Sequence, residues 1–189
     1  MLDPLGAGVR RRLRQSLNAF GDLELEWATD VHCALGVLDE LALLNGERWR
    51  RRGQAGVFAN PTFSSFHREL VTRLLPAGRA ILFRVKKDGH TVGCLYCLAE
   101  HRRVLFYQGG FAHFADNRLR AGLVSHVQCM RACLERGFDE YDFLAGDARY
   151  KDELSTGARH MVWASLRRPR VRLAVAEGAR ATRSLVRGR

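Results

Sequence analysis

Apolar runs are short throughout this chain, and none approaches the roughly 20 residues that span a bilayer. Arginines at positions 10, 11, 12 and 14 occupy the place where a signal peptide would carry its apolar region. These absences argue against a membrane span, and we expect a cytoplasmic protein. With 189 residues, of which 47% are hydrophobic and 27% charged, the composition is that of one ordinary globular domain.

Cysteine is scarce and its count is odd, which argues against a disulfide framework. Among the five cysteines, Cys94 and Cys97 lie three apart in an apparent strand, so their side chains should point to opposite faces. Cys129 and Cys133 lie four apart on an expected helix, one turn after His126, but no second cluster completes a tetrahedral set. Core packing explains these residues better than a metal site, and no metal is expected.

Lysine is also rare, with three Lys among the 31 cationic residues. The formal net charge of +11 gathers at the ends, because residues 1–14 hold four Arg against one Asp and residues 167–189 hold eight Arg against one Glu. A nucleic-acid-binding domain more often carries cations across its folded face, so nucleic acid is not expected as a partner. The terminal arginines are best explained as solvated, with phosphates, anionic lipid or an acidic protein as alternatives.

Hydrophobic periodicity predicts a mixture of helices and strands. Helices are expected over residues 9–20, 29–49, 62–74, 119–136 and 150–154. Strands are expected over residues 23–27, 79–86, 91–100, 104–108, 140–144 and 159–168, with a basic helix or tail over 171–186. A three-stranded antiparallel meander followed by a helix and a parallel strand predicts an α/β fold, with a central mixed sheet flanked by helices.

Several short signals refine this outline. Asp88-Gly89 predicts a tight hairpin turn, and Asn45-Gly46 is a point where the second helix could be interrupted. Either Thr62 or Ser64 is expected to begin the third helix, and Gly109-Gly110 is expected to end the strand over 104–108.

The stretch FDEYDFLAGDARYK, residues 138–151, carries the strongest functional signal. Its aromatic strand stops at Gly146, and Asp147 is a candidate N-cap for the helix that follows. Ligands of α/β sheets usually bind at the carboxyl ends of strands, where Asp147, Tyr150 and Lys151 would lie. A carboxylate, a phenol and an amine at that place predict a reaction centre. A capped helix with a surface lysine is an equally good explanation of the spacing alone.

The string DFLAGDARYKDEL resembles the signature of the acetyltransferases related to the CelD proteins of cellulose biosynthesis. These belong to the GNAT (Gcn5-related N-acetyltransferase) superfamily, whose structural cousins are the Fem peptidyltransferases. The resemblance extends over about residues 23–166 and includes Arg48-Trp49, Arg52-Gly53 and the YQGGF run over residues 107–111. The chain departs from the family at two places. It has Ala145 where the family often has Arg, and it has Arg-Ala-Gly at residues 120–122 where the family usually has Ser-Pro-Gly.

The resemblance implies a GNAT-like acyl-CoA N-acyltransferase fold, corresponding to the carboxyl-terminal lobe of longer family members. Residues 23–168 would form this domain, after a basic helical extension over 1–22 and before a basic helix or tail over 169–189. In this superfamily two parallel central strands part, and acyl-CoA enters the gap. The resemblance therefore places the donor, acetyl-CoA or another acyl-CoA, against the following residues: Tyr107, Gln108, Gly109, Gly110, Arg118, Arg120 and Gly122.

Acyl transfer requires an amine or hydroxyl to lose a proton and the leaving thiolate to gain one. The resemblance implies that Tyr150 protonates the thiolate, and Asp147 or His113 could accept the acceptor's proton. Lys151 could hold a phosphate or an acidic acceptor. The sequence has no Ser-His-Asp or Cys-His signature, which agrees with direct attack. The expected acceptor is a small-molecule or carbohydrate-linked amine or hydroxyl, contacted by residues 49–63.

Two other functions stay open at this stage. A Fem-like transferase would use aminoacyl-tRNA, and an isolated lobe without catalytic activity would serve a structural or regulatory partner. The sequence is also compatible with a homodimer. A rise in melting temperature with acetyl-CoA would favour the acyltransferase, and a rise with tRNA alone would favour the Fem-like enzyme.

Overall fold

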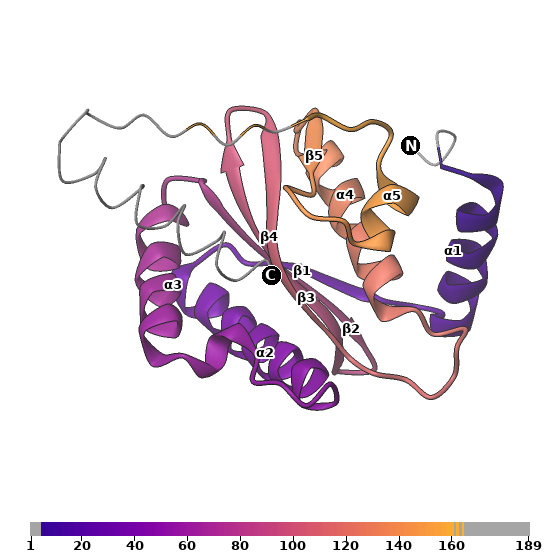
Figure 1. Ribbon diagram of the computed structural model, residues 1–189, viewed down its shortest axis with the longest axis horizontal. Helices are drawn as coiled ribbons and strands as arrows, with labels where there is room; N and C mark the ends of the chain where they lie inside the picture. The colour runs from indigo at the N-terminus through magenta and orange to yellow at the C-terminus, as the bar shows by residue number, and fades with distance from the viewer. Residues whose placement is uncertain (1–4, 161, 163, 165–189) are drawn as a thin grey trace, which may run out of the picture. The chain divides into compact units, whose positions relative to one another are not determined.

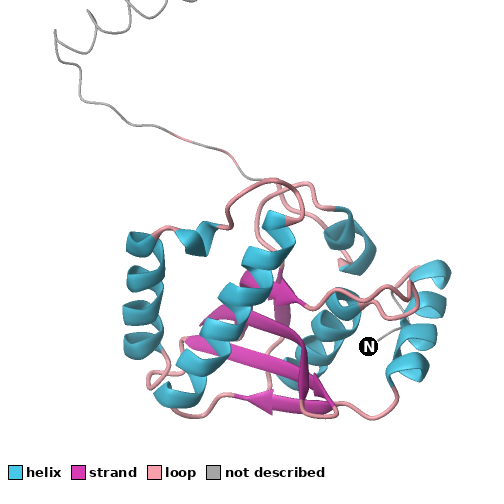
Figure 2. Cartoon of the chain, turned by 90° about the horizontal axis from the view of Figure 1, so that it is seen from below, coloured by secondary structure: helices cyan, strands magenta, loops and turns pink. Residues whose placement is uncertain are grey.

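Five strands form one mixed sheet in the order β1-β2-β3-β4-β5, with helices on both faces (Figures 1 and 2). The computed structural model describes residues 5–160, 162 and 164. Residues up to Ala158 form one unit, and a second unit begins at Arg159. The elements are α1 (Ala7–Phe20), β1 (Glu24–Trp27), α2 (Val31–Arg50), the 3-10 turn η1 (Val57–Ala59), α3 (Pro61–Leu74), β2 (Ala80–Lys87), β3 (His90–Glu100), β4 (Arg103–Phe111), α4 (Ala121–Glu135), β5 (Glu140–Asp142) and α5 (Arg149–Leu154).

The predicted meander is confirmed, since β1 to β4 pair antiparallel in sequence order. Asp88 and Gly89 connect β2 to β3 with φ of 49° and 76°. Two positive φ angles are what the tight hairpin turns of the mirror-image type require, and Asp and Gly adopt them readily. The edge strand predicted at the start of the sheet is β1.

Strands β2, β3 and β4 send side chains to two separate cores on the two faces of the sheet. Ile81, Phe83 and Val85 of β2 join the core under α1 and α4, while Ala80 and Leu82 join the core under α2 and α3. Figures 1 and 2 show these helix pairs on opposite faces. The same alternation, with a period of two residues, separates Cys97 in the first core from Cys94 in the second, as their spacing predicted.

Two helix predictions need correction. The prediction that Thr62 or Ser64 begins the third helix was wrong, because α3 starts at Pro61 and is capped by Asn60, whose Oδ1 accepts a hydrogen bond from Thr62 N at 2.9 Å. Proline suits the first helical turn, where its missing N–H costs nothing. The second helix runs without interruption through Asn45 to Arg50.

The boundaries of the fourth and fifth strands, β4 and β5, also differ from the prediction. Gly109 and Gly110 do not end the strand, because β4 continues through both to Phe111. β5 pairs parallel with β4, as predicted, but spans only Glu140–Asp142. The α5 N-cap is Ala148, whose side chain makes no capping bond, so the prediction that Asp147 caps this helix was wrong.

The predicted strand over residues 159–168 is not present at His160, Val162 or Ala164. Its other positions from 161 onward, and the basic helix or tail over 171–186, lie outside the described residues. Within the part of the chain that is described, no helix is long and apolar enough to cross a membrane.

Candidate functional site

The two parallel strands part soon after they begin. Their register joins Arg103, Val104 and Leu105 of β4 to the three residues of β5 and goes no further, while β4 continues to Phe111. The pairing of β4 with β3 also shifts between Tyr96 and Cys97, so that β4 has one extra residue at Tyr107. Such a bulge bends a strand and increases its twist. The second half of β4 is thereby directed away from the path of β5.

The side chain of Tyr150, from α5, packs where the strands part. Its ring stacks on that of His126 of α4, with centroids 5.1 Å apart and planes inclined by 16°. Phe106 and Phe143 contribute edge contacts with the Tyr150 ring at 6.4 and 5.8 Å. Burial raises the pKa of the Tyr150 phenol, and the nearby Arg48 guanidinium lowers it by a smaller amount. The phenol is therefore protonated at neutral pH and can donate a proton.

His126 supports this ring from a buried, mostly aromatic environment, in which its Nδ1 lies 3.4 Å from the Tyr141 hydroxyl. Its side chain is buried, and burial lowers its pKa from 6.5 to about 3. The imidazole is therefore neutral under ordinary conditions. A charged imidazole would disturb the aromatic cluster around Tyr150.

Acid should destabilise the fold through His126. Between pH 6.5 and 3, His126 is protonated in the unfolded chain and stays neutral in the folded chain. The free energy of unfolding therefore falls as the pH falls through that window. The expected loss at pH 5 is about 2 kcal/mol. Urea denaturation at pH 7 and pH 5 should show a smaller loss in His126→Phe than in the unchanged protein. An identical pH dependence in both proteins would show that His126 is not the group responsible.

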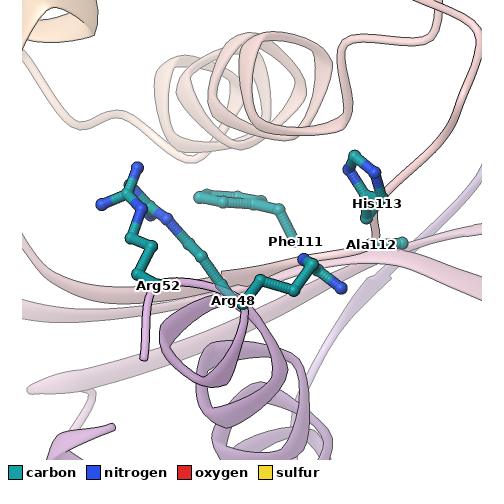
Figure 3. A pocket seen from close by; sticks show the side chains of 6 residues that line it. Arg48, Arg52, Phe111, Ala112 and His113 are labelled. Carbon is teal, nitrogen blue, oxygen red and sulfur yellow. The ribbon is translucent and has the colours of Figure 1, made fainter. Parts of the chain in front are cut away.

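An open pocket of about 300 Å³ lies where the end of α2 meets the end of β4. Figure 3 shows Arg48 and Arg52 reaching into it from α2 and the turn that follows, with Phe111, Ala112 and His113 on the strand side. Arg51 completes the lining. Phe111, which lines the pocket, packs against His126 with ring centroids 5.5 Å apart, and His126 stacks on Tyr150, so the pocket adjoins Tyr150 through these rings.

The predicted donor residues on β4 have different surroundings. The Tyr107 hydroxyl lies 3.1 Å from Nε2 of the buried His67, in the core under α2 and α3. Gln108 is half-buried and lies opposite Tyr96 in the sheet register. The Gly109 carbonyl accepts a hydrogen bond of 3.1 Å from Asn45 Nδ2 of α2.

Gly110 is explained by packing against α2. A Cβ atom at this position would lie 2.5 Å from the Leu41 carbonyl oxygen and 3.0 Å from the Leu44 Cβ. Real Cβ atoms do not approach backbone so closely. Gly110 therefore lets α2 approach β4, and this approach places the α2 arginines beside the end of the strand.

The residues before α4 form ion pairs and hydrogen bonds with neighbouring residues and with α1. Arg118 is exposed and pairs with Asp116 at 2.8 Å, which lowers the pKa of that carboxyl. The buried Ser16 hydroxyl of α1 donates to the Arg118 carbonyl, and Ser16 Oγ accepts a hydrogen bond of 3.4 Å from the Arg120 N–H. No side chain caps the N-terminus of α4, and Gly122 lies in its first turn beside the Phe111 ring. The uncapped first turn leaves backbone N–H groups that favour an anion.

Asp147 lies in the connection between β5 and α5, and Lys151 lies in the first turn of α5. Asp147 is exposed and does not line the pocket. Lys151 Nζ donates to the carbonyls of Leu144 at 3.2 Å and Ala145 at 2.7 Å. Leu144 has φ of +59°, an unusual value for a residue other than glycine, so the lysine stabilises a strained connection next to Tyr150.

The structure thus brings Tyr150 and the pocket that His113 lines together through the rings of Phe111 and His126. Sequence reasoning did not name Arg48, Phe111 and Ala112 as site residues, and it included Arg51 and Arg52 only within the stretch 49–63 that was expected to contact the acceptor. The signal that could have found Arg48 and Arg52 is the Arg48–Trp49 and Arg52–Gly53 run, which was used only as support for a resemblance. Among the described residues no three His, Cys, Asp or Glu side chains are placed to hold a metal ion.

Comparison with known proteins gives the following. A family model described as acetyltransferase (GNAT) domain matches residues 7–152. An aminoglycoside acetyltransferase from an uncultured soil metagenomic sample has a TM-score of 0.51 at 15% identity, covering 79% of this chain and all of that one. A GCN5-related N-acetyltransferase from Ralstonia eutropha JMP134 has a TM-score of 0.51 at 11% identity, covering 77% and 98% of the two chains. A possible acetyltransferase from Clostridium difficile 630 gives 0.51 at 9% identity, covering 78% and 99%. No curated protein matches the sequence.

Proposed function

Because this chain belongs to the acetyltransferase (GNAT) domain family, we propose that it transfers an acyl group, acetyl in the first instance, from acyl-CoA to an amine or hydroxyl acceptor. The observation that carries the proposal is the parting of β4 and β5 after three residue pairs, with Tyr150 packed at the opening. A thioester lying there would meet backbone groups of β4 that β5 does not pair. It would also meet the phenol that can protonate the leaving sulfur.

The proposed donor site has two parts. The acyl arm would lie along β4 near Gly109, Gly110 and the bulge at Tyr107. The phosphates would lie at the uncapped start of α4, near Arg120 and Gly122, where N–H groups and the helix dipole favour negative charge. Arg118 would contribute after exchanging its Asp116 partner for a phosphate.

The proposed chemistry is direct attack. The thioester supplies an activated carbonyl: the acceptor nitrogen or oxygen bonds to this carbon, and the carbon–sulfur bond breaks. The proton lost by the acceptor would pass to His113, which lines the pocket, or through water to Asp147. The proton gained by the sulfur would come from Tyr150, whose pKa burial keeps high.

Lys151 is proposed to position Tyr150 rather than to hold a ligand. In Lys151→Met the carbonyls of Leu144 and Ala145 lose their ammonium donor, so α5 and Tyr150 should lose precise placement. We expect kcat to fall about tenfold while KM for acyl-CoA changes less than about twofold. Steady-state kinetics would check this, since a raised KM with unchanged kcat would instead mean that Lys151 binds the donor.

Several finer points stay proposals. The DFLAGDARYK string supports the CelD-like subtype, and the likeness to an aminoglycoside acetyltransferase supports a small-molecule amine as the acceptor. An aminoglycoside itself is disfavoured, because its several positive charges would approach a pocket lined by three arginines. A cytoplasmic location and a carbohydrate-linked acceptor remain compatible with this proposal.

The function is tested by melting the full chain with and without acetyl-CoA, and by following release of the free thiol in the presence of mixed amines. A ligand at tenfold excess over its Kd should raise the melting temperature by about 3–6 °C. A rise with tRNA and none with acetyl-CoA would favour the Fem-like transferase. No rise with either would contradict the proposed donor site.

A further inference from the structure

We propose that the pocket lined by Arg48, Arg51 and Arg52 holds an anionic group of the acyl acceptor, a carboxylate or a phosphate, and so selects acidic acceptors. This inference rests on the proposed function, because it names the class of molecule that receives the acyl group. It depends on the charge, the partners and the position of the three arginines.

Among the described residues, no carboxylate forms a salt bridge with these arginines. Several other arginines are paired, for example Arg84 with Glu26, Arg102 with Asp139 and Arg149 with Glu153. Within residues 5–160, none of the three pocket arginines forms a salt bridge, and Arg52 instead lies 5.6 Å from the centroid of the Trp49 ring. A pocket with three unpaired guanidinium groups favours an anion.

The arginines also repel one another. Burial lowers the pKa of the half-buried Arg48, and the charge of Arg52 lowers it further. Both effects mean that the charged form of Arg48 is less stable here than in water. An anion placed between the two guanidinium groups would remove that penalty by offering opposite charge and hydrogen-bond acceptors.

Helix termini favour cations at their C-terminal ends, and this effect accounts for some of the arginines. Arg50, in the last turn of α2, is exposed and does not line the pocket, so it needs no other explanation. Arg48 and Arg52 differ because they face Phe111 and His113 across a cavity (Figure 3). The dipole of α2 does not explain why these arginines point toward the end of β4.

The position of the pocket favours the acceptor over the donor as its ligand. The start of α4, where the donor's phosphates are proposed to bind, belongs with α1 to one core of the sheet. The arginines extend from α2, which covers the opposite face, and the pocket approaches the start of α4 through Phe111, whose ring lies beside Gly122. An acceptor held by its anionic group in the pocket would present its amine or hydroxyl toward Tyr150, which adjoins the pocket through the rings of Phe111 and His126.

The test uses the full chain and inorganic phosphate as the probe, with chloride at equal ionic strength as the reference. Phosphate at tenfold excess over its Kd should raise the melting temperature by about 3–6 °C. The rise should disappear in the double variant Arg48→Met/Arg52→Met, where the aliphatic stems are kept and the charges are lost. Arg50→Met, at the same helix end but outside the pocket, should keep the full rise and serves as the matched control. An equal phosphate effect in the double variant would overturn the inference.

A second arm separates acceptor from donor. With saturating acetyl-CoA present, phosphate should still add its own rise, and the double variant should keep its response to acetyl-CoA. If acetyl-CoA abolishes the phosphate effect, or if the double variant no longer responds to acetyl-CoA, the pocket holds the donor's phosphates and the inference is wrong. If the unchanged protein responds to phosphate and not to acetyl-CoA, the proposed function itself fails. Should the double variant not fold, Arg52→Met alone, at an exposed position, gives the same comparison.

Discussion

Replacing Tyr150 with Phe is expected to lower kcat about 100-fold or more while KM for acetyl-CoA stays within about twofold. The variant keeps the ring that stacks on His126 and removes only the hydroxyl, so the fold should be unaffected. The physical reason is the leaving thiolate, which would have to depart without a proton donor. Because burial raises the pKa of this phenol, the rate should also decline at high pH in the unchanged protein as Tyr150 loses its proton.

The matched control is Tyr96→Phe. Tyr96 is fully buried in the core under α2 and α3, and its hydroxyl has no hydrogen-bond partner among the described residues. Removing this hydroxyl should leave kcat unchanged. Steady-state thiol release from acetyl-CoA measures both variants. Equal turnover in Tyr150→Phe and the unchanged protein would remove the proposed proton donor and leave the reaction without an identified acid.

Gly110→Ala is expected to destabilise the protein by about 1–3 kcal/mol, lowering the melting temperature by about 2–12 °C. The new Cβ would meet the Leu41 carbonyl oxygen at 2.5 Å, so either α2 or β4 must move. Movement of α2 would also displace Arg48 and Arg52, and the variant should therefore bind phosphate more weakly. Thermal melting and the phosphate titration measure the two effects.

Gly36→Ala provides the comparison within the same helix. Gly36 is exposed on α2, and nothing lies within 4 Å of a Cβ built there. Alanine at an unhindered helical position should stabilise the protein by about 0.4–1 kcal/mol, because it restricts the unfolded chain. Opposite signs for the two glycine substitutions would attribute the loss at Gly110 to the close approach of α2. Similar losses at both positions would contradict that explanation.

Local signals were sufficient for most of the fold. The turn at Asp88-Gly89, the alternation of β2 and β3 and the helical stripes all depend on neighbouring residues, whose geometry sets periods of two or 3.6 residues. The parallel pairing of β4 and β5 followed from the handed crossover through α4. Asp147, Tyr150 and Lys151 were singled out as a reaction centre because they are close in sequence, and their role stays a prediction.

Boundaries that depend on distant contacts were predicted less well. Gly109 and Gly110 look like the end of a strand, yet β4 continues because α2 needs the space that a side chain at Gly110 would fill. Asp147 looks like an N-cap, but the N-cap of α5 is the next residue, Ala148. The connection before it has a positive φ at Leu144, and Lys151 donates a hydrogen bond to the carbonyl of that residue. Neither outcome is visible in the adjacent residues.

By itself, the sequence determined the order of helices and strands and the stretch that contains Tyr150, because hydrophobic periodicity and turn residues act over short distances. Only the tertiary structure decided that α2 delivers Arg48 and Arg52 to a pocket at the end of β4, where Phe111 packs against His126 and His126 stacks on Tyr150. The physical reason is that the groups with which an arginine side chain interacts are set by tertiary packing and not by the residues next to it in the sequence. Which helix packs against which end of the sheet depends on side-chain volume across the whole core.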